Sequence, residues 1–286
     1  MAKSLSGRKA WVTGSSRGIG RCIAEQLAQA GCDVAIHGRN RSNLRSSGEG
    51  DDLVEVASEM AHRHGVKVVA ICGELTDEGE VKRCCEEVVS QLGGLDILVC
   101  NAGGANLTGE LDMNAGRDTA SNFDLESLEK RFQHNLATTA LCCREAVPLL
   151  KQSSAPRIVT IGSIAGCGGN KTGGHFAPYS LAKAAVHQYT RLLAAELRHD
   201  GIPVNCVIPG NIHTPSTAIR FHYGQGLTKP GQSRLEGLGV PADIAGLVSF
   251  LCGPGGAYID KKSLFRGTDT RPPACACPHA DRLEPV

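Results

Sequence analysis

The 286-residue sequence predicts a single-domain α/β fold, in which helices cover both faces of a doubly wound parallel sheet. Two observations predict it: short apolar segments alternate with helical patterns along the chain, and glycine-containing or polar turns separate them. The length is also ordinary for one α/β domain. Strands are expected near 9–12, 33–37, 66–71, 96–100, 157–161 and 202–208, and helices near 18–30, 51–64, 77–92, 125–150, 177–199 and 241–252.

The first strand leads into a glycine-rich turn, since the segment from Trp11 to Gly20 has the sequence WVTGSSRGIG. Apolar residues at helical spacing follow it: Ile23, Ala24, Leu27 and Ala28. Glycines allow a tight turn and let a diphosphate approach the backbone, and a helix N-terminus favours the anion. The segment therefore predicts a dinucleotide site that includes Gly14, Ser16, Arg17, Gly18, Ile19 and Gly20.

The end of the second strand bears on which dinucleotide binds. An NAD site usually places an acidic side chain there for the ribose 2′-hydroxyl. This chain has Gly38 at that position, followed by Arg39, and it has Arg17 in the glycine-rich turn. Guanidinium groups bind phosphate in bidentate geometry, so two of them suit a 2′-phosphate. The sequence thus favours NADP(H) over NAD(H).

Tyr179 and Lys183 form a possible acid/base pair on the helix expected near 177–199. Residues four apart share one helix face, so the Lys183 ammonium is expected beside the Tyr179 phenol. A nearby positive charge lowers the pKa of a phenol from its usual value of ~10. Such a phenol can exchange a proton with a carbonyl or alcohol oxygen, and Ser163 could hydrogen-bond the same oxygen.

Bulk composition excludes some function classes. The formal charge is +1, from 30 basic and 29 acidic residues, which gives no electrostatic reason to expect nucleic acid or an anionic membrane as partner. No apolar run approaches the ~20 residues of a membrane span, and residues 1–8 lack the apolar core of a signal peptide. We therefore expect a cytoplasmic protein, with its 13 cysteines as reduced thiols.

Together these segments resemble the short-chain dehydrogenase/reductase family, in its ordinary, non-extended type. The resemblance runs from about Lys9 to Tyr258 and implies a Rossmann-like fold. The motifs that carry it, in chain order, are Thr13-Gly14-x-x-x-Gly18-x-Gly20, Asn101-Ala102-Gly103, Asn135, Ser163, Tyr179-x-x-x-Lys183 and Pro209-Gly210-Asn211-Ile212-His213-Thr214.

The resemblance implies a catalytic set of Asn135, Ser163, Tyr179 and Lys183. Tyr179 would be the general acid in reduction and the base in oxidation, Lys183 would lower its pKa, and Asn135 would support a proton-relaying water. Further cofactor contacts are implied at Glu74, Leu75, Asn101, Ala102, Gly103, Tyr179, Lys183, Pro209, Gly210, Ile212 and Thr214. A homodimer or homotetramer is also implied, and a metal is not.

Two enlarged loops and a polar segment are expected to shape the substrate pocket. They are residues 104–122, 167–178 and 215–235, the last as a mobile lid. Candidate substrate contacts are His175, Phe176 and Tyr223. The polar character of the lid segment favours a polar or ring ketone over a long acyl chain.

The C-terminal part departs from the family pattern, which normally ends in a strand of the form Gly-Gln-x-x-x-Val-Asp-Gly-Gly. Ser263-Leu264-Phe265 could still form a short strand, but the glycines and the acidic residue are missing. We therefore expect a domain over 1–260, a divergent tail over 261–286, a weak seventh strand and a perturbed tetramer. Cys275, Cys277 and His279 in the tail are too few for a convincing zinc site.

The sequence leaves several functions open. The leading one is an NADPH-dependent carbonyl reductase, or the reverse alcohol dehydrogenase. A 3-oxoacyl carrier-protein reductase and a sugar or polyol dehydrogenase are alternatives of the same class. A cofactor-sensing binding protein with little turnover belongs to a different class, and the intact pair of Tyr179 and Lys183 argues against it.

Overall fold

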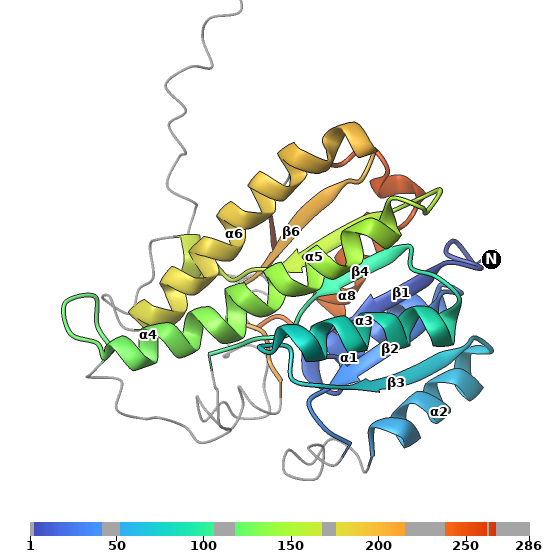
Figure 1. Ribbon diagram of the computed structural model, residues 1–286, viewed down its shortest axis with the longest axis horizontal. Coiled ribbons are helices and arrows are strands. Elements are labelled where there is room, and N and C mark those ends of the chain that lie inside the picture. Colours follow the sequence, from blue (N-terminus) through green and yellow to red (C-terminus); the bar gives the residue numbers. More distant parts are fainter. Residues whose placement is uncertain are drawn as a thin grey trace, which may run out of the picture.

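The computed structural model describes residues 3–41, 52–105, 118–167, 176–214, 238–261 and 263–266. Its centre is one parallel sheet, drawn as arrows in Figure 1. The strands are β1 (Lys9–Val12), β2 (Asp33–Gly38), β3 (Val68–Cys72), β4 (Ile97–Cys100), β5 (Arg157–Ile161), β6 (Val204–Pro209) and β7 (Ser263–Arg266). All six expected strands are present, within two residues of the expected starts and ends.

The sheet has the order β3-β2-β1-β4-β5-β6-β7, and every neighbouring pair is parallel. The chain runs outward from β1 to β3 on one side and then returns to β4 on the other side of β1. This reversal between β1 and β4 opens a crevice at the carboxyl ends of the two strands, which is where open α/β sheets bind ligands.

The helices are α1 (Gly18–Gln29), α2 (Leu53–His64), α3 (Glu78–Leu92), α4 (Leu125–Phe132), α5 (Thr138–Leu150), α6 (Ala177–Leu197) and α8 (Pro241–Cys252). Local chemistry explains several of their ends. Asp52 and Asp77 accept hydrogen bonds from backbone N–H groups in the first turns of α2 and α3. Gly65 and Gly93 end these helices in the left-handed conformation that glycine adopts without strain.

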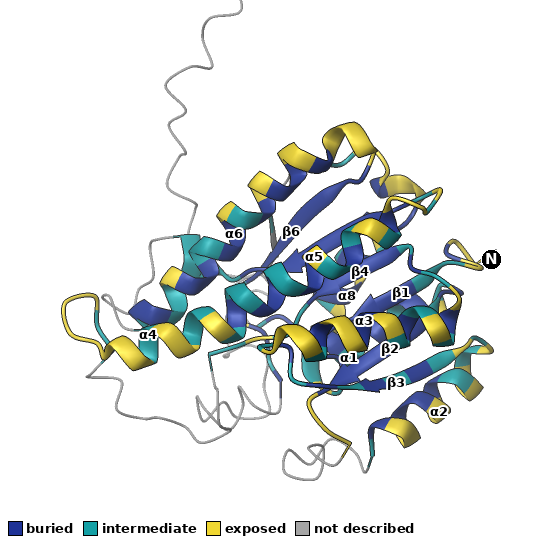
Figure 2. Cartoon of the chain, in the orientation of Figure 1, coloured by how far each residue is buried: buried dark blue, intermediate teal, exposed yellow. Residues whose placement is uncertain are grey.

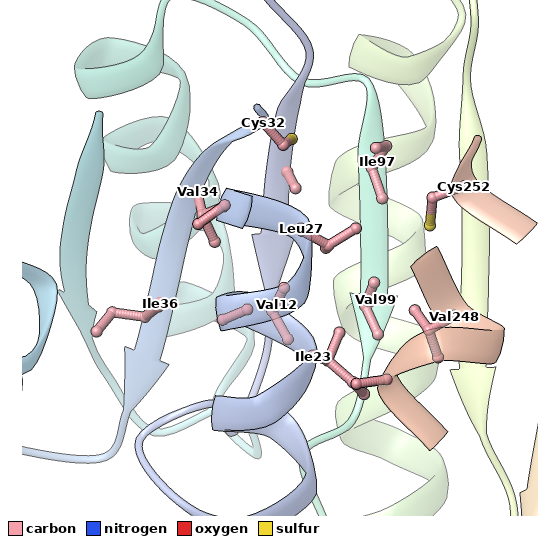
Figure 3. Close-up of a cluster of buried hydrophobic side chains, with 14 of the residues drawn as sticks. Val12, Ile23, Leu27, Cys32, Val34, Ile36, Ile97, Val99, Val248 and Cys252 are labelled. Atoms are coloured by element: carbon pink, nitrogen blue, oxygen red, sulfur yellow. The ribbon is translucent and has the colours of Figure 1, made fainter. Parts of the chain in front are cut away.

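One face of the sheet is covered by α1, α2 and α8 (Figures 1 and 3). In Figure 3, Ile23 and Leu27 of α1 and Val248 of α8 point toward the strands. They meet alternate strand side chains, among them Val12 and Val99. These residues are fully buried, so both helices are held by apolar burial rather than by surface charge.

The other face is covered by α3, α5 and α6, which pack on the intervening strand residues such as Trp11, Leu98 and Ile158. Figure 2 shows the strands buried between helices whose outer surfaces are exposed. Because helices cover both faces, the predicted doubly wound, Rossmann-like α/β fold is confirmed.

The helix expected over 125–150 is present over those residues, but it contains a turn that the sequence did not predict. A π-helical turn, Gln133–Ala137, separates α4 from α5. Residues 125–132 are all at least partly exposed, whereas α5 has a buried face that includes Cys142 and Ala146. The wider turn adds a residue to the helical repeat, and such turns often lie at functional sites. Asn135 lies within it and is fully buried.

The short strand that Ser263-Leu264-Phe265 could form is present as β7. It pairs in parallel register with β6 from Cys206 to Pro209. Three further contacts tie the preceding turn to β6: Lys261 N–H donates to Val204 O, Asn205 Nδ2 to Ile259 O, and Asp260 Oδ1 accepts from Val204 N–H. The sheet therefore extends beyond residue 260, where the sequence placed the end of the domain.

All cysteines in the described part of the chain are free. Burial raises the pKa of Cys85 and of Cys252 to about 12, so these thiols act as small apolar side chains. None of the described helices combines the length and the apolarity that crossing a bilayer requires. Cys275, Cys277 and His279 are outside the described residues.

Candidate active site

A cleft opens at the crevice between β1 and β4, with walls from the ends of four strands and from the π-helical turn. Its lining includes predicted cofactor contacts: Gly14, Ser16, Arg17, Arg39, Glu74, Leu75, Asn101, Ala102 and Gly103. Five other residues also line it: His37, Gly38, Gly104, His134 and Thr138. Residues that are far apart in the sequence are thus brought together at one edge of the sheet.

Asn101 joins the ends of β1 and β4 beneath this cleft. Its Nδ2 donates to Gly14 O at 2.8 Å and to Thr13 O at 3.1 Å. Thr13 Oγ1 in turn accepts from the backbone N–H groups of Asn101 and Ala102, each at 3.0 Å. The buried Thr13 hydroxyl and the Asn101 amide therefore fix the glycine-rich turn relative to β4.

Gly14 is required for two reasons. Its φ is +60°, which side-chain-bearing residues rarely adopt, and a Cβ there would lie 2.8 Å from Ala102 Cα. The turn can therefore pass close to the backbone of Ala102, which also lines the cleft. Glycine-rich turns of this kind let a diphosphate approach backbone N–H groups closely.

His37, the penultimate residue of β2, bridges two walls of the cleft. Its Nδ1 accepts from Gly14 N–H at 3.1 Å, and its Nε2 lies 3.1 Å from Gly73 O. Because Nδ1 accepts, the neutral ring carries its proton on Nε2 and donates it to Gly73 O. Burial lowers the pKa of His37 to about 4, against the opposing influence of Gly73 O and Glu74, so the ring is neutral at physiological pH.

This buried ring makes folding sensitive to acid. The unfolded His37 takes up a proton below its ordinary pKa of 6.5, whereas the folded one does so only near 4. The contribution of the neutral His37 ring to the free energy of unfolding is therefore complete above pH 6.5 and is lost as the pH falls toward 4. Between pH 7 and pH 5 we expect wild type to lose about 2 kcal/mol more unfolding free energy than His37→Gln.

Urea denaturation at the two pH values measures this difference. The matched control is His199→Gln, since His199 is an exposed histidine just beyond α6. Equal losses in wild type and His37→Gln would show that His37 is not held neutral by the fold.

Arg17 and Arg39 both line the cleft, and both are exposed. Neither forms an ion pair with another residue that the structure describes. Gly38, at the end of β2, also lines the cleft and has no side chain. Two guanidinium groups are therefore available to a phosphate at the end of β2.

Lys183 lies on the buried side of α6, next to the end of β5. Its Nζ donates to Ile161 O at 2.9 Å, and the side chain is 4% exposed. Burial lowers the pKa of Lys183 to about 8. Tyr179, one helical turn earlier, is half-buried on the same face, and Ser163 follows Ile161 by two residues. The three predicted catalytic side chains thus lie around the end of β5.

Asn135 binds backbone at the end of the cleft. Its Oδ1 accepts from Gly104 N–H at 2.9 Å, and its Nδ2 donates to Arg131 O at 2.9 Å and to Gly104 O at 3.2 Å. The side chain is therefore fixed by protein groups on both its donor and its acceptor side. It joins the π-helical turn to the segment that follows Asn101-Ala102-Gly103.

The segment after β6 approaches the glycine-rich turn. A Cβ on Gly18 would lie 3.9 Å from Thr214 Cγ2, and Ile212 forms a parallel bridge with Gly239. The Ile212 side chain is buried in the core and therefore anchors this segment against the sheet. Pro209 ends β6, and Gly210 follows it. Gly18, Ile19 and Gly20 begin α1 rather than line the cleft.

The predicted substrate contacts are only partly within the described residues. Phe176 precedes α6 with a left-handed φ of 62°, and its carbonyl accepts from Ser180 N–H. His175 and Tyr223 lie outside the described residues, as do most of the loop 104–122 and the proposed lid 215–235. The roles of all three as substrate contacts stay predictions.

Several site residues were not predicted from the sequence: His37, Gly104, His134, Thr138 and His187. His134 and Thr138 flank Asn135 in the π-helical turn, which the sequence did not reveal. His187 follows Lys183 by four residues and therefore continues the face of Tyr179 and Lys183. That spacing is the one signal that could have indicated it.

The family comparison supports the geometry. The model of the short chain dehydrogenase family matches residues 8–222, most of the described fold. The chain belongs to the short-chain dehydrogenase family. Members of this family are oxidoreductases that act on alcohol and carbonyl groups, so the predicted family and reaction class are confirmed.

Relatives of this short-chain dehydrogenase have several named activities. It is 33% identical to a cyclohexanol dehydrogenase of Rhodococcus sp. (strain TK6), over 89% of this chain and 93% of the relative. It is 34% identical to a 3-oxoacyl-[acyl-carrier-protein] reductase of Aquifex aeolicus, over 91% and 95% respectively. A solved L-sorbose reductase of Gluconobacter frateurii, complexed with NADPH and L-sorbose, has a TM-score of 0.78 at 26% identity, covering 93% of this chain and 97% of that one.

Proposed function

We propose that this short-chain dehydrogenase interconverts a ketone or aldehyde and an alcohol with NADP(H), and that Tyr179 is the general acid/base. The observation that carries the proposal is the arrangement at the end of β5. Lys183 is anchored to Ile161 O by a 2.9 Å hydrogen bond, Ser163 follows two residues later, and Tyr179 shares the helix face of Lys183.

The residues of the cleft fit a nicotinamide dinucleotide. The glycine-rich turn that contains Gly14 lines the cleft and would hold the diphosphate. Arg17 and Arg39 would hold a 2′-phosphate, and Gly38 offers no acidic side chain for a 2′-hydroxyl. When bound, the cofactor supplies or accepts the hydride. NADPH in the related L-sorbose reductase is consistent with this choice.

Tyr179 would donate a proton to the carbonyl oxygen in reduction and take it back in oxidation. Ser163 Oγ would hydrogen-bond the same oxygen and orient it. Lys183 would act through its charge, because a nearby ammonium favours the phenolate form of Tyr179. Since burial lowers the pKa of Lys183 to about 8, that charge is lost in the free protein as the pH rises through 8.

The substrate class that fits best is a polar or ring ketone or the corresponding alcohol. A cyclohexanol dehydrogenase and an L-sorbose reductase among the similar proteins support it. The 3-oxoacyl-[acyl-carrier-protein] reductase supports an acyl thioester as the alternative. These activities are those of the similar proteins, and an assay with each class of carbonyl compound identifies the substrate of this chain.

A fluorescence titration with NADPH and, separately, with NADH tests the cofactor. We expect NADPH to bind at least about tenfold more tightly, a difference of ~1.4 kcal/mol. Oxidation of NADPH at 340 nm is then followed with cyclohexanone, L-sorbose and an acetoacetyl thioester. Tighter NADH binding would overturn the cofactor assignment, and cofactor binding without turnover of any carbonyl compound would favour a sensor.

A further inference from the structure

His187 occupies the third position of the α6 face that carries Tyr179 and Lys183. Residues 179, 183 and 187 are successive members of an i, i+4 series and so follow one another along one side of the helix. Lys183 binds the carbonyl of Ile161 at the end of β5. His187 binds the same segment two residues later, since its Nε2 accepts from Ser163 N–H at 3.2 Å.

The imidazole contacts both ends of the short helical turn η3 (Ile164–Cys167) that follows Ser163. Because Nε2 accepts, the neutral ring carries its proton on Nδ1. Nδ1 lies 3.7 Å from Cys167 Sγ, and the ring is also hydrogen-bonded to the backbone of Gly166. The ring therefore accepts from the N–H at the start of this segment and donates to the backbone near its end.

Two glycines in the segment after β5, Gly162 and Gly166, make room for the His187 imidazole. A Cβ on Gly162 would lie 2.6 Å from His187 Cδ2, and a Cβ on Gly166 would lie 2.9 Å from His187 Cε1. Both glycines thus leave the space that the imidazole fills. His187 is 4% exposed, so no bulk water competes for these hydrogen bonds.

We propose that His187 is a positioning residue for the reaction, which holds the backbone of Ser163 so that its hydroxyl faces the substrate oxygen. This inference rests on the proposed function, because the position of Ser163 matters for catalysis only if that hydroxyl binds the substrate. His187 itself touches neither substrate nor cofactor, since its ring is buried beneath Ser163, Gly162 and Gly166.

Burial and the neighbouring cations keep the His187 ring neutral, so that Nε2 remains a hydrogen-bond acceptor. Lys183 and Arg191 are the cations that face it, Cys167 and Cys206 are the adjacent thiols, and no carboxylate among the described residues contributes. Burial and these two cations lower the pKa of His187 to about 4. The ring is therefore a constant acceptor for Ser163 N–H across the physiological pH range.

The test compares His187→Ala, His187→Gln and the matched control His199→Gln, an exposed histidine just beyond α6. With NADPH and the carbonyl compound that wild type reduces, we expect His187→Ala to lower kcat roughly 10- to 100-fold, as small misplacements of catalytic groups do. NADPH affinity should stay within about twofold, because the cofactor cleft does not include His187. Added imidazole should restore part of kcat, and the Gln variant should retain more activity than the Ala variant.

A second measurement does not depend on turnover. Amide hydrogen exchange of residues 162–167 should be slow in wild type and in His199→Gln, and faster at Ser163 in His187→Ala. Unchanged exchange at Ser163 would overturn the inference, as would a joint fall of kcat and NADPH affinity that imidazole does not reverse. Failure of wild type to reduce any carbonyl compound would instead count against the proposed function, and the exchange experiment would still decide whether His187 holds Ser163.

Discussion

Replacing Tyr179 with phenylalanine is expected to lower kcat by roughly 10²- to 10⁴-fold, the range that general acid/base groups contribute. The substitution removes one hydroxyl and keeps the ring, so the packing of α6 is preserved. Lys183 would keep its hydrogen bond to Ile161 O. Cofactor binding should therefore survive, and the loss should appear in kcat rather than in the dissociation constant of NADPH.

Stopped-flow and steady-state assays with NADPH measure this effect, and a fluorescence titration checks cofactor binding. Tyr189→Phe is the matched control, because Tyr189 lies on the same helix but packs into the core on the side of α5. It should leave kcat nearly unchanged. If Tyr179→Phe kept wild-type turnover, another group would have to supply the proton, and the proposed role of Tyr179 would be wrong.

A carboxylate at position 38 should reverse the cofactor preference. Gly38 ends β2 between Ser16 and Arg39, and a Cβ there would meet only ordinary contacts, the nearest being Leu53 Cδ2 at 3.4 Å. Gly38→Asp therefore fits without displacing the backbone. The new charge would repel a 2′-phosphate and could accept a hydrogen bond from a 2′-hydroxyl.

We expect Gly38→Asp to weaken NADPH binding by roughly 10- to 100-fold and to strengthen NADH binding, since like-charge contacts cost several kcal/mol when desolvated and less at an exposed site. Gly38→Ala is the control, because it adds the Cβ without the charge and should keep the preference for NADPH. Titrations of the two variants with both cofactors give the answer. An Asp variant that still prefers NADPH would mean that the end of β2 does not face the 2′-position.

The sequence predicted those parts of the site that are encoded locally. The turn from Gly14 to Gly20 combines strand, glycines and helix start within one short segment, so its structure could be inferred without tertiary information. The pairing of Tyr179 with Lys183 on one helix face needed only the helical repeat. The parallel sheet with helices on both faces followed from the alternation of strands and helices.

The residues that escaped prediction act through contacts between distant segments. The sequence indicates only that His37 lies in a strand, yet it bridges Gly14 and Gly73. His187 was one more position in a long helix until β5 was placed beside it. The π-helical turn at Gln133–Ala137 was missed because one added residue hardly disturbs a helical pattern in the sequence.

The last strand was also hard to predict, for a different reason. A parallel ladder is made by backbone groups, so β7 can pair with β6 although the family's usual side chains are missing there. A side-chain pattern therefore does not reveal a strand that is held mainly by backbone hydrogen bonds.

The pairing of β7 with β6 also determines which strand forms this edge of the sheet. Every residue of β6 is buried, and β7 is its outer neighbour. Without β7, the backbone groups of a fully buried apolar strand would form an open edge, and such edges recruit strands from other molecules and aggregate. The four residues Ser263–Arg266 thus cover the edge of β6, and their removal is expected to promote aggregation even if the active site stays intact.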